Sequence, residues 1–465
     1  MTLHDLIDRR NLLRIGSLGL AATALPGSSA APAVSLGKAK SVIFLWMAGG
    51  VTHIDSFDPK PQAPVEIRGT LTDISTRLPG VRFCETVPRL AEIADDLALV
   101  RSFSHESNDH LLSQVFTLSG RKVGTTELYT HPNIGSFYSR LHGARNGLPG
   151  YIAIPGITRP GPPPYNFFVG GWLGTRHKPY CLGGSPEQPD FTVKEKLDNP
   201  PSEIDEELTP RSLSLLQADD RQRLNGRVSL RDQLDGALRK LEQDDILAGV
   251  EKKHQDAVRL LTNPGVRNAF DLTQESTATR ELYGRTKVGG RCLMARRLVE
   301  AGARFVMVDY GYDPDYGNVW DNHNAPSQNH PPIQQMVKRG YHLAGMDMAF
   351  AALITDLKQR GRLDETLVVF VTEFGRTPKI NARGGRDHWG KAGSIFFAGG
   401  GTKAGTVVGA TDDHAAEPVT SGYTPADIAA TIYKATGIDH EQFVTDIQDR
   451  PRAILDVGSP IPVFG

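Results

Sequence analysis

The sequence predicts an α/β fold in which helices cover both faces of a mostly parallel central sheet. Three observations support this prediction. Six short apolar runs, each of the length of a buried strand, are spread along the chain. Stretches with the apolar spacing of amphipathic helices alternate with several of these runs. Segments rich in Pro and Gly separate the elements, as is typical of long structured loops.

The first strand is expected at 41–47, where a nearly continuous apolar run ends at Ala48-Gly49-Gly50. The other strands are expected at 97–100, 151–154, 304–309, 366–372 and 394–397. Helical patterns cover 291–301, 333–360 and 425–436. Strands that alternate with helices are typical of βαβ units, whose strands lie parallel.

Two stretches interrupt this alternation. Residues 155–210 are rich in Pro and Gly and are expected to form a long excursion from the sheet. Residues 225–262 are charged, with leucines at spacings of three and four, and this pattern predicts an inserted helical segment that covers the sheet.

The bulk composition excludes some classes of protein. The 465 residues carry 52 Lys and Arg against 53 Asp and Glu, so the net charge is close to zero. A nucleic-acid partner is therefore not expected. The three cysteines, Cys84, Cys181 and Cys292, are too few and too widely spaced for a disulfide framework or a CxxC metal site. One bridge is possible, but small buried hydrophobic residues are the simpler interpretation.

The amino terminus has the pattern of a targeting segment. Arg9-Arg10 and Leu12-Leu13 precede an apolar run at 15–25, and small residues follow through Ala33. The pattern resembles a twin-arginine signal peptide over 1–33, with the twin-arginine translocase as partner and the periplasm or the cell exterior as destination. The alternative is an ordinary amphipathic helix. The run is too short to span a membrane, and no later run is long enough, so no stable span is expected in the mature chain, 34–465.

Candidate site residues follow the predicted strands, because ligands of parallel sheets bind beyond the carboxyl ends of the strands. Asp and His are ligands that Zn²⁺ and similar cations accept, and Glu extends the set. One such pair alone is typical of a surface loop, but several pairs near one edge predict a divalent metal site. The candidate metal ligands are His53, Asp55, Asp321, His323, Glu373, Asp387 and His388.

Three arginines accompany these residues. Arg121 follows Leu118-Ser119-Gly120, Arg376 follows Glu373, and Arg386 precedes Asp387. The arginine side chain suits the oxygens of phosphate or sulfate, so we expect these residues to hold an anionic group. The alternative is that each pairs with a local carboxylate.

Several blocks together resemble an exported bacterial family known only as domain of unknown function 1501. They are Phe44 to Gly50, Thr52 to Lys60, Trp320 to His323, Thr372 to Pro378, Gly385 to Trp389, Ala398 to Gly401 and Val408 to Thr411. The resemblance covers nearly all of the predicted mature chain. That family is similar to the alkaline phosphatase and sulfatase superfamily, which implies an alkaline-phosphatase-like α/β/α sandwich. It also implies one or two divalent metals that activate a nucleophile.

Only some of the superfamily's metal-ligand positions have a matching residue in this sequence. Its strand carboxylate falls on Glu373, but Phe374 stands where a histidine is expected. Its second block resembles Asp321 and His323, and its late histidine resembles His388 with Asp387 beside it. The carboxylate that normally follows the first strand is absent at Ala48, and His53 and Asp55 are the nearest substitutes.

The nucleophile is the largest departure from the superfamily. Sulfatases place a Cys or Ser ten residues before the glycine of a Leu-Thr-Gly-Arg signature, which resembles Leu118 to Arg121 here. The matching position is His110, and no Cys-x-Pro-x-Arg motif is present. His110 is therefore a candidate covalent nucleophile, a candidate metal ligand, or an ordinary residue at a helix start.

Two functions remain open on the sequence alone. The first is metal-dependent hydrolysis of phosphate or sulfate esters, with a small anionic ester or a sulfated or phosphorylated glycan as substrate. The sequence does not distinguish Zn, Ca, Mg and Mn as the metal. The second is a non-catalytic, metal-stabilised binding or surface protein with a degenerate site.

Overall fold

A computed structural model describes residues 37–156, 167–182, 263–313, 315–324 and 330–465. The predicted signal peptide at 1–33 and the predicted helical insertion at 225–262 lie outside the described residues. So does most of the predicted excursion at 155–210.

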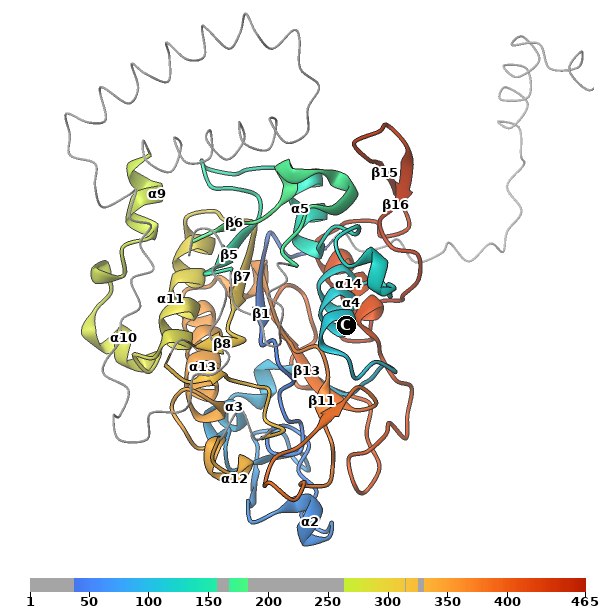
Figure 1. Cartoon of the computed structure of the whole chain (residues 1–465). Helices are drawn as coiled ribbons and strands as arrows, with labels where there is room; N and C mark the ends of the chain where they lie inside the picture. The colour runs from blue at the N-terminus through green and yellow to red at the C-terminus, as the bar shows by residue number, and fades with distance from the viewer. Residues whose placement is uncertain (1–36, 157–166, 183–262, 314, 325–329) are drawn as a thin grey trace, which may run out of the picture. The chain divides into compact units, whose positions relative to one another are not determined.

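The domain is built on an eight-stranded sheet in the order β14-β4-β13-β10-β1-β7-β5-β6 (Figure 1). Seven strands run in one direction and β13 runs against its neighbours β10 and β4. In chain order the strands are β1 (Ser41–Trp46), β4 (Ala98–Phe103), β5 (Ile152–Ile154), β6 (Tyr180–Cys181), β7 (Phe305–Asp309), β10 (Thr366–Val371), β13 (Gly393–Ala398) and β14 (Thr406–Val408). All six predicted strands are present, and the predicted mostly parallel sheet is confirmed.

Helices cover both faces of this sheet, as predicted. One face packs against α3 (Pro88–Glu92), α11 (Lys287–Glu300) and α13 (Leu343–Gln359). The other packs against α4 (His110–Ser119), α5 (Ile134–His142) and α14 (Pro425–Ala435). In the central strand β1, Ile43 and Leu45 join the first core, whereas Val42, Phe44 and Trp46 join the second. Because burial of one large apolar side chain contributes about 1.5–3 kcal/mol, both cores hold β1 in place.

Shorter elements connect these layers. The remaining helices are α2 (Val65–Arg68), α9 (Pro264–Ala269), α10 (Thr277–Leu282) and α12 (Ile333–Met336). Four two-stranded pairs join β2 (Asp73–Ser75) with β3 (Arg82–Cys84), β8 (Tyr312–Asp313) with β9 (Gly317–Asn318), β11 (Gly375–Arg376) with β12 (His388–Trp389), and β15 (Phe443–Thr445) with β16 (Pro451–Ala453). Single 3₁₀ turns lie at Ala94–Asp96, Thr125–Glu127, Gly171–Leu173, Thr175–His177, Leu272–Gln274 and Leu363–Glu365.

One predicted helix is divided in the structure. The stretch 333–360 forms α12 and α13 with a break between them, where Gly340 lies. A Cβ atom added to Gly345 would lie 1.8 Å from the carbonyl oxygen of Gly340. The chain therefore folds back closely at this break, which apolar spacing alone does not reveal.

The direction of β13 decides which loops reach the site. The parallel neighbours of the sheet end at one edge, and β13 begins at that same edge because it runs against them. Residues just before β13 therefore lie beside residues that follow β4 and β10. In a fully parallel sheet they would lie at the opposite edge.

The cysteines and the helices bear on two further expectations. All three cysteines are free, and Cys84 and Cys292 are buried. Among the described residues, no helix has both the length and the apolar character needed to cross a membrane.

Candidate metal centre

Three side chains converge at the edge of the sheet where the parallel strands end. They are His110, Asp321 and His388, and one ligand atom from each lies within 4.8 Å of the others. His110 begins α4, Asp321 follows β9, and His388 begins β12. The chain thus brings together three segments that are far apart in sequence.

Local structure fixes two of these residues. Asp109 caps α4, because its side chain accepts a hydrogen bond from the backbone N–H of Leu112 at 2.9 Å. His110 is therefore held as the first residue of the helix. In the antiparallel pair of β11 and β12, His388 lies directly opposite Arg376.

Asp321 is the centre of the group. Its Oδ1 accepts hydrogen bonds from His388 Nε2 at 3.0 Å and from Arg376 Nη2 at 2.9 Å. His323 Nε2 lies 3.4 Å from Oδ2. Burial favours the neutral acid, but the neighbouring histidines outweigh it and hold the pKa of Asp321 well below its usual value. Asp321 is therefore an anion throughout the physiological range.

Glu373 lies behind His110 and orients it. Glu373 is fully buried, and the backbone N–H of Gly49 contacts both carboxylate oxygens, at 2.8 and 2.7 Å. His110 Nδ1 lies 2.8 Å from Glu373 Oε1. A carboxylate that accepts a hydrogen bond from one ring nitrogen leaves the other nitrogen of the histidine available for a metal.

The donor atoms fit a divalent cation. His110 Nε2 is buried and faces Asp321 Oδ1 at 3.3 Å, and no regular hydrogen bond fixes it. Two imidazole nitrogens and one carboxylate oxygen around one point form the mixed donor set that Zn²⁺ and related ions accept. The predicted metal site therefore has a geometric basis in His110, Asp321 and His388.

The protonation states agree with such a role. Burial opposes a charge on His110, but Asp321 and Glu373 outweigh it and raise the pKa of His110 to about 9. In the metal-free group His110 thus carries a proton that a cation would replace. Burial lowers the pKa of His388 despite the neighbouring Asp321, so His388 is neutral at pH 7, as a ligand must be.

Phe374 forms an apolar wall beside the group. Its ring centre lies 4.9 Å from that of His388 and 5.1 Å from that of His110. Phe374 stands where the superfamily resemblance implies a histidine, and in the structure it packs against the two histidines.

Arg376 is committed to the protein itself. It is fully buried, and besides Asp321 it donates to four carbonyl oxygens, those of Gly49, Gly50, Trp320 and Arg386. Arg376 therefore fixes the loop after β1 against Asp321.

Several predicted site residues lie in other environments. Asp55 and Arg386 form a buried two-pronged ion pair, with distances of 2.8 and 2.9 Å. His53 Nε2 lies 2.8 Å from the carbonyl oxygen of Ala415.

Two more predicted site residues lie outside the group. Asp387 is exposed and accepts a hydrogen bond from the Asn381 side chain at 3.1 Å. Arg121 pairs with Asp456 beyond the far end of α4. The structure brings His110, Asp321, His323, Glu373, Arg376 and His388 together.

The sequence analysis did not select three residues that lie at the candidate metal centre. His105 Nε2 lies 2.5 Å from the carbonyl oxygen of Glu373, and the Gly49 N–H holds the Glu373 carboxylate. His330 is buried, its Nδ1 has no hydrogen bond, and its pKa is lowered by burial although Asp321 acts to raise it. The position of His105 just after β4 was an available signal, since other candidates were chosen for following a strand.

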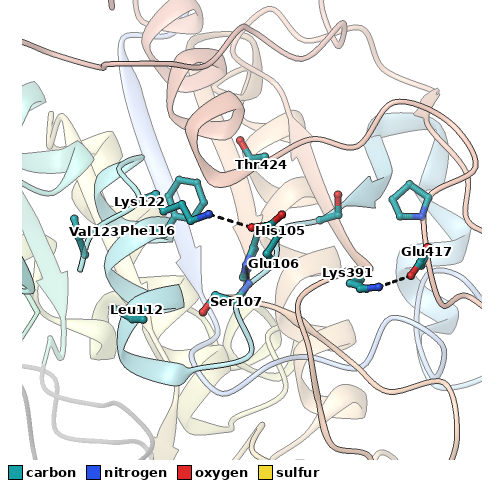
Figure 2. A pocket seen from close by; sticks show the side chains of 12 residues that line it. His105, Glu106, Ser107, Leu112, Phe116, Lys122, Val123, Lys391, Glu417 and Thr424 are labelled. Atoms are coloured by element: carbon teal, nitrogen blue, oxygen red, sulfur yellow. Dashed lines mark hydrogen bonds and ion pairs between the residues drawn. The ribbon is translucent and has the colours of Figure 1, made fainter. Parts of the chain in front are cut away.

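A pocket of about 570 Å³ lies on the side of His105, and none of His110, Asp321 and His388 lines it (Figure 2). His105, Ser107, Leu112 and Lys391 are among the residues that line it. Ser107 and Leu112 are close in sequence to His110, and Lys391 is close in sequence to His388. Two ion pairs flank it, Lys122 with Glu106 at 3.2 Å and Lys391 with Glu417 at 2.6 Å (Figure 2). A hollow of this volume matches small-molecule sites.

The fold and this group define a class: an α/β domain with a candidate metal centre at the edge where its parallel strands end. Within that class, the family model described as a protein of unknown function (DUF1501) matches residues 39–463. The chain belongs to this family, as the sequence blocks predicted. No curated protein matches the chain in sequence.

The fold is similar to several solved structures, at low scores. A phosphonate monoester hydrolase from Silicibacter pomeroyi has 12% identity and a TM-score of 0.37, over 86% of this chain and 74% of that one. A lipoteichoic acid synthase from Listeria monocytogenes has 9% identity and a TM-score of 0.34, over 87% and 74%. Ps i-CgsB, in complex with a neocarrahexaose, has 13% identity and a TM-score of 0.38, over 86% and 72%.

Proposed function

We propose that the protein is a metal-dependent hydrolase of phosphate or sulfate esters that works outside the cytoplasm. The observation that carries the proposal is the convergence of His110, Asp321 and His388 around one point, with His323 beside Asp321. A divalent cation bound there supplies Lewis acidity toward a phosphoryl or sulfuryl oxygen and lowers the pKa of a water molecule. Zn, Ca, Mg and Mn remain alternatives, and the nitrogen-rich donor set favours Zn.

The chain's own residues have separate tasks in this proposal. Glu373 fixes the Nδ1 proton of His110, so that Nε2 faces Asp321. Arg376 holds Asp321 in place and compensates its charge. Phe374 excludes water from one side of the two histidines, and the pocket in Figure 2 receives the organic part of the ester. His110 is then a ligand and not a covalent nucleophile.

The second candidate is a metal-stabilised binding protein without turnover. One observation favours it: the three arginines expected to hold an anionic group are all engaged within the protein. Arg376 binds Asp321 and four carbonyl oxygens, Arg386 binds Asp55, and Arg121 binds Asp456. In the hydrolase proposal, charge compensation of the substrate therefore depends on the cation and on residues at the pocket.

Asp321→Asn tests the proposal, because this change removes the negative charge and keeps the size of the side chain. We expect metal content to fall to background and the hydrolysis of nitrophenyl phosphate or sulfate to fall at least a hundredfold. The measurements are elemental analysis of the purified protein and steady-state rates with each metal. His414→Ala, at an exposed histidine, is the control.

The outcomes separate the two candidates. Bound metal together with turnover that Asp321→Asn abolishes supports the hydrolase. Bound metal with no turnover on any phosphate or sulfate ester supports the binding protein. Absence of metal from both the native protein and the variant would contradict both.

A further inference from the structure

A second pocket, of about 770 Å³, lies beyond the far end of α4 from His110. Arg121 follows α4 and lines this pocket, and a helix of ten residues is about 15 Å long. The other walls include His131, Trp172, and residues of the β15–β16 pair such as Phe443 and Arg452. The pocket is thus separate from the candidate metal centre, and its volume is that of a small-molecule site.

Two nitrogen atoms of residues that line this pocket are buried without a hydrogen bond. They are Nε of Arg121 and Nδ1 of His131. The Arg121 side chain is only 7% exposed, and its terminal nitrogens already bind the Asp456 carboxylate and the Ala453 carbonyl oxygen. The guanidinium group is therefore fixed. Because a buried polar atom without a partner is unfavourable, these two atoms favour a ligand with hydrogen-bonding groups over a purely apolar one.

Two aromatic rings belong to the same wall. Phe443 is 67% exposed and lines the pocket, so its ring is accessible to a ligand. The carbonyl oxygen of Trp172 accepts from the backbone N–H of Ile447 at 3.1 Å, which ties the tryptophan to the loop after β15. Trp172 also packs edge-on against Phe137, with ring centres 5.3 Å apart. The rings thus offer an apolar surface on a fixed support.

Two carboxylates, Glu441 and Asp456, complete the lining. They disfavour a simple inorganic anion, because they offset the charge of Arg121 and Arg452. A purely apolar ligand would leave Arg121 Nε and His131 Nδ1 without partners. A saccharide meets every condition, since its hydroxyl groups both donate and accept and its ring has an apolar C–H face.

We infer that this pocket binds a saccharide. Arg121 and His131 contact its oxygens, Glu441 and Asp456 accept from its hydroxyl groups, and Phe443 and Trp172 pack against its ring. This binding does not require the metal centre, so it stands whether or not the protein is a hydrolase.

Phe443→Ala provides the test, because an exposed ring can be removed without opening the core. The full chain, the variant and a Val419→Ala control are applied to an array of neutral and acidic oligosaccharides, and the tightest glycan is then titrated by calorimetry. Val419 is also exposed, at 64%, and does not belong to the pocket lining. We expect a glycan whose Kd rises at least tenfold in Phe443→Ala and is unchanged in the control.

Arg121→Lys adds an independent readout, because it keeps the positive charge beside Asp456 and removes Nε. We expect weaker binding of the same glycan, with unchanged metal content. Failure of every glycan to bind, equal binding by Phe443→Ala, or equally tight binding of inorganic sulfate would each overturn the inference. None of these readouts depends on ester hydrolysis, so the two proposals can fail separately.

Discussion

At the scale of single residues, the candidate site depends on one carboxylate that points at histidines and one that stands behind them. Asp321 follows β9 and Glu373 follows β10, and the sequence places both among the metal ligands. The structure distinguishes them by their partners. Asp321 contacts His388 and Arg376, whereas Glu373 is enclosed by the Gly49 N–H and His110. The different contacts of the two carboxylates depend on the directions of their side chains, which cannot be read from spacing in the sequence.

Glu373→Gln tests the orienting role. The glutamine keeps an oxygen for the Gly49 N–H but removes the negative charge beside His110. We expect metal affinity to fall about 10- to 100-fold, as for other residues that support a ligand, with the fold retained. Competition with a chelating dye measures the change.

Glu365→Gln is the matched control, because Glu365 forms an exposed ion pair with Lys40. Equal metal affinity in Glu373→Gln and the native protein would rule out the orienting role.

His342 provides a prediction on pH. It is fully buried, with Nε2 2.9 Å from Asn322 Oδ1, and burial lowers its pKa to about 3. Since the unfolded chain binds this proton near pH 6.5, neutral His342 stabilises the fold above that pH, and the contribution is lost as the pH falls toward 3. The loss is about 2 kcal/mol between neutral pH and pH 5.

His342→Gln removes this titration and keeps a donor for Asn322. We expect the free energy of unfolding of the variant, measured with urea, to fall less between pH 7 and pH 5 than that of the native protein. His414→Gln, at an exposed position, should behave as the native protein does. Parallel pH profiles for the native protein and His342→Gln would refute the assignment.

At the scale of elements, apolar runs were sufficient to locate the six main strands, because each is buried on both faces. The short edge strands β6 and β14 have two and three residues and give no such signal. The break between α12 and α13 and the reversed direction of β13 also escaped prediction. Strand direction depends on how the chain connects the strands, and His388, which precedes β13, reaches the candidate metal centre because β13 is reversed.

The turn after β1 makes a prediction at this scale. Gly49 has a φ of +129°, and a Cβ atom there would lie 2.8 Å from Cβ of Trp320. Gly49→Ala should therefore destabilise the fold by about 1–3 kcal/mol and displace the N–H that holds Glu373. Thermal unfolding and metal content measure the two effects.

Gly80→Ala separates backbone strain from steric overlap. Gly80 also has a positive φ, of +77°, but no atom lies within 4 Å of its added Cβ. It should lose a smaller amount of stability and no metal. Equal losses of stability in the two variants would exclude the steric contribution at Gly49.

At the scale of the whole molecule, the proposal that the protein is exported depends on residues 1–33 and remains a prediction. Changing Arg9 and Arg10 to lysine should block passage through the twin-arginine translocase, because that route recognises the arginine pair. Cell fractionation with an antibody to the protein measures the result. A control that changes Arg14 alone should still be exported, and export of the double lysine variant would contradict the assignment.

The position of β1 has a consequence for biogenesis. This strand is synthesised early, yet both its neighbours, β7 and β10, come from the second half of the chain, and the Gly49 contact with Glu373 spans 324 residues. The centre of the sheet cannot close while the ribosome is still making the middle of the protein. Contacts of such long range slow folding. A nascent chain therefore leaves the apolar β1 without its neighbours until Glu373 has been synthesised.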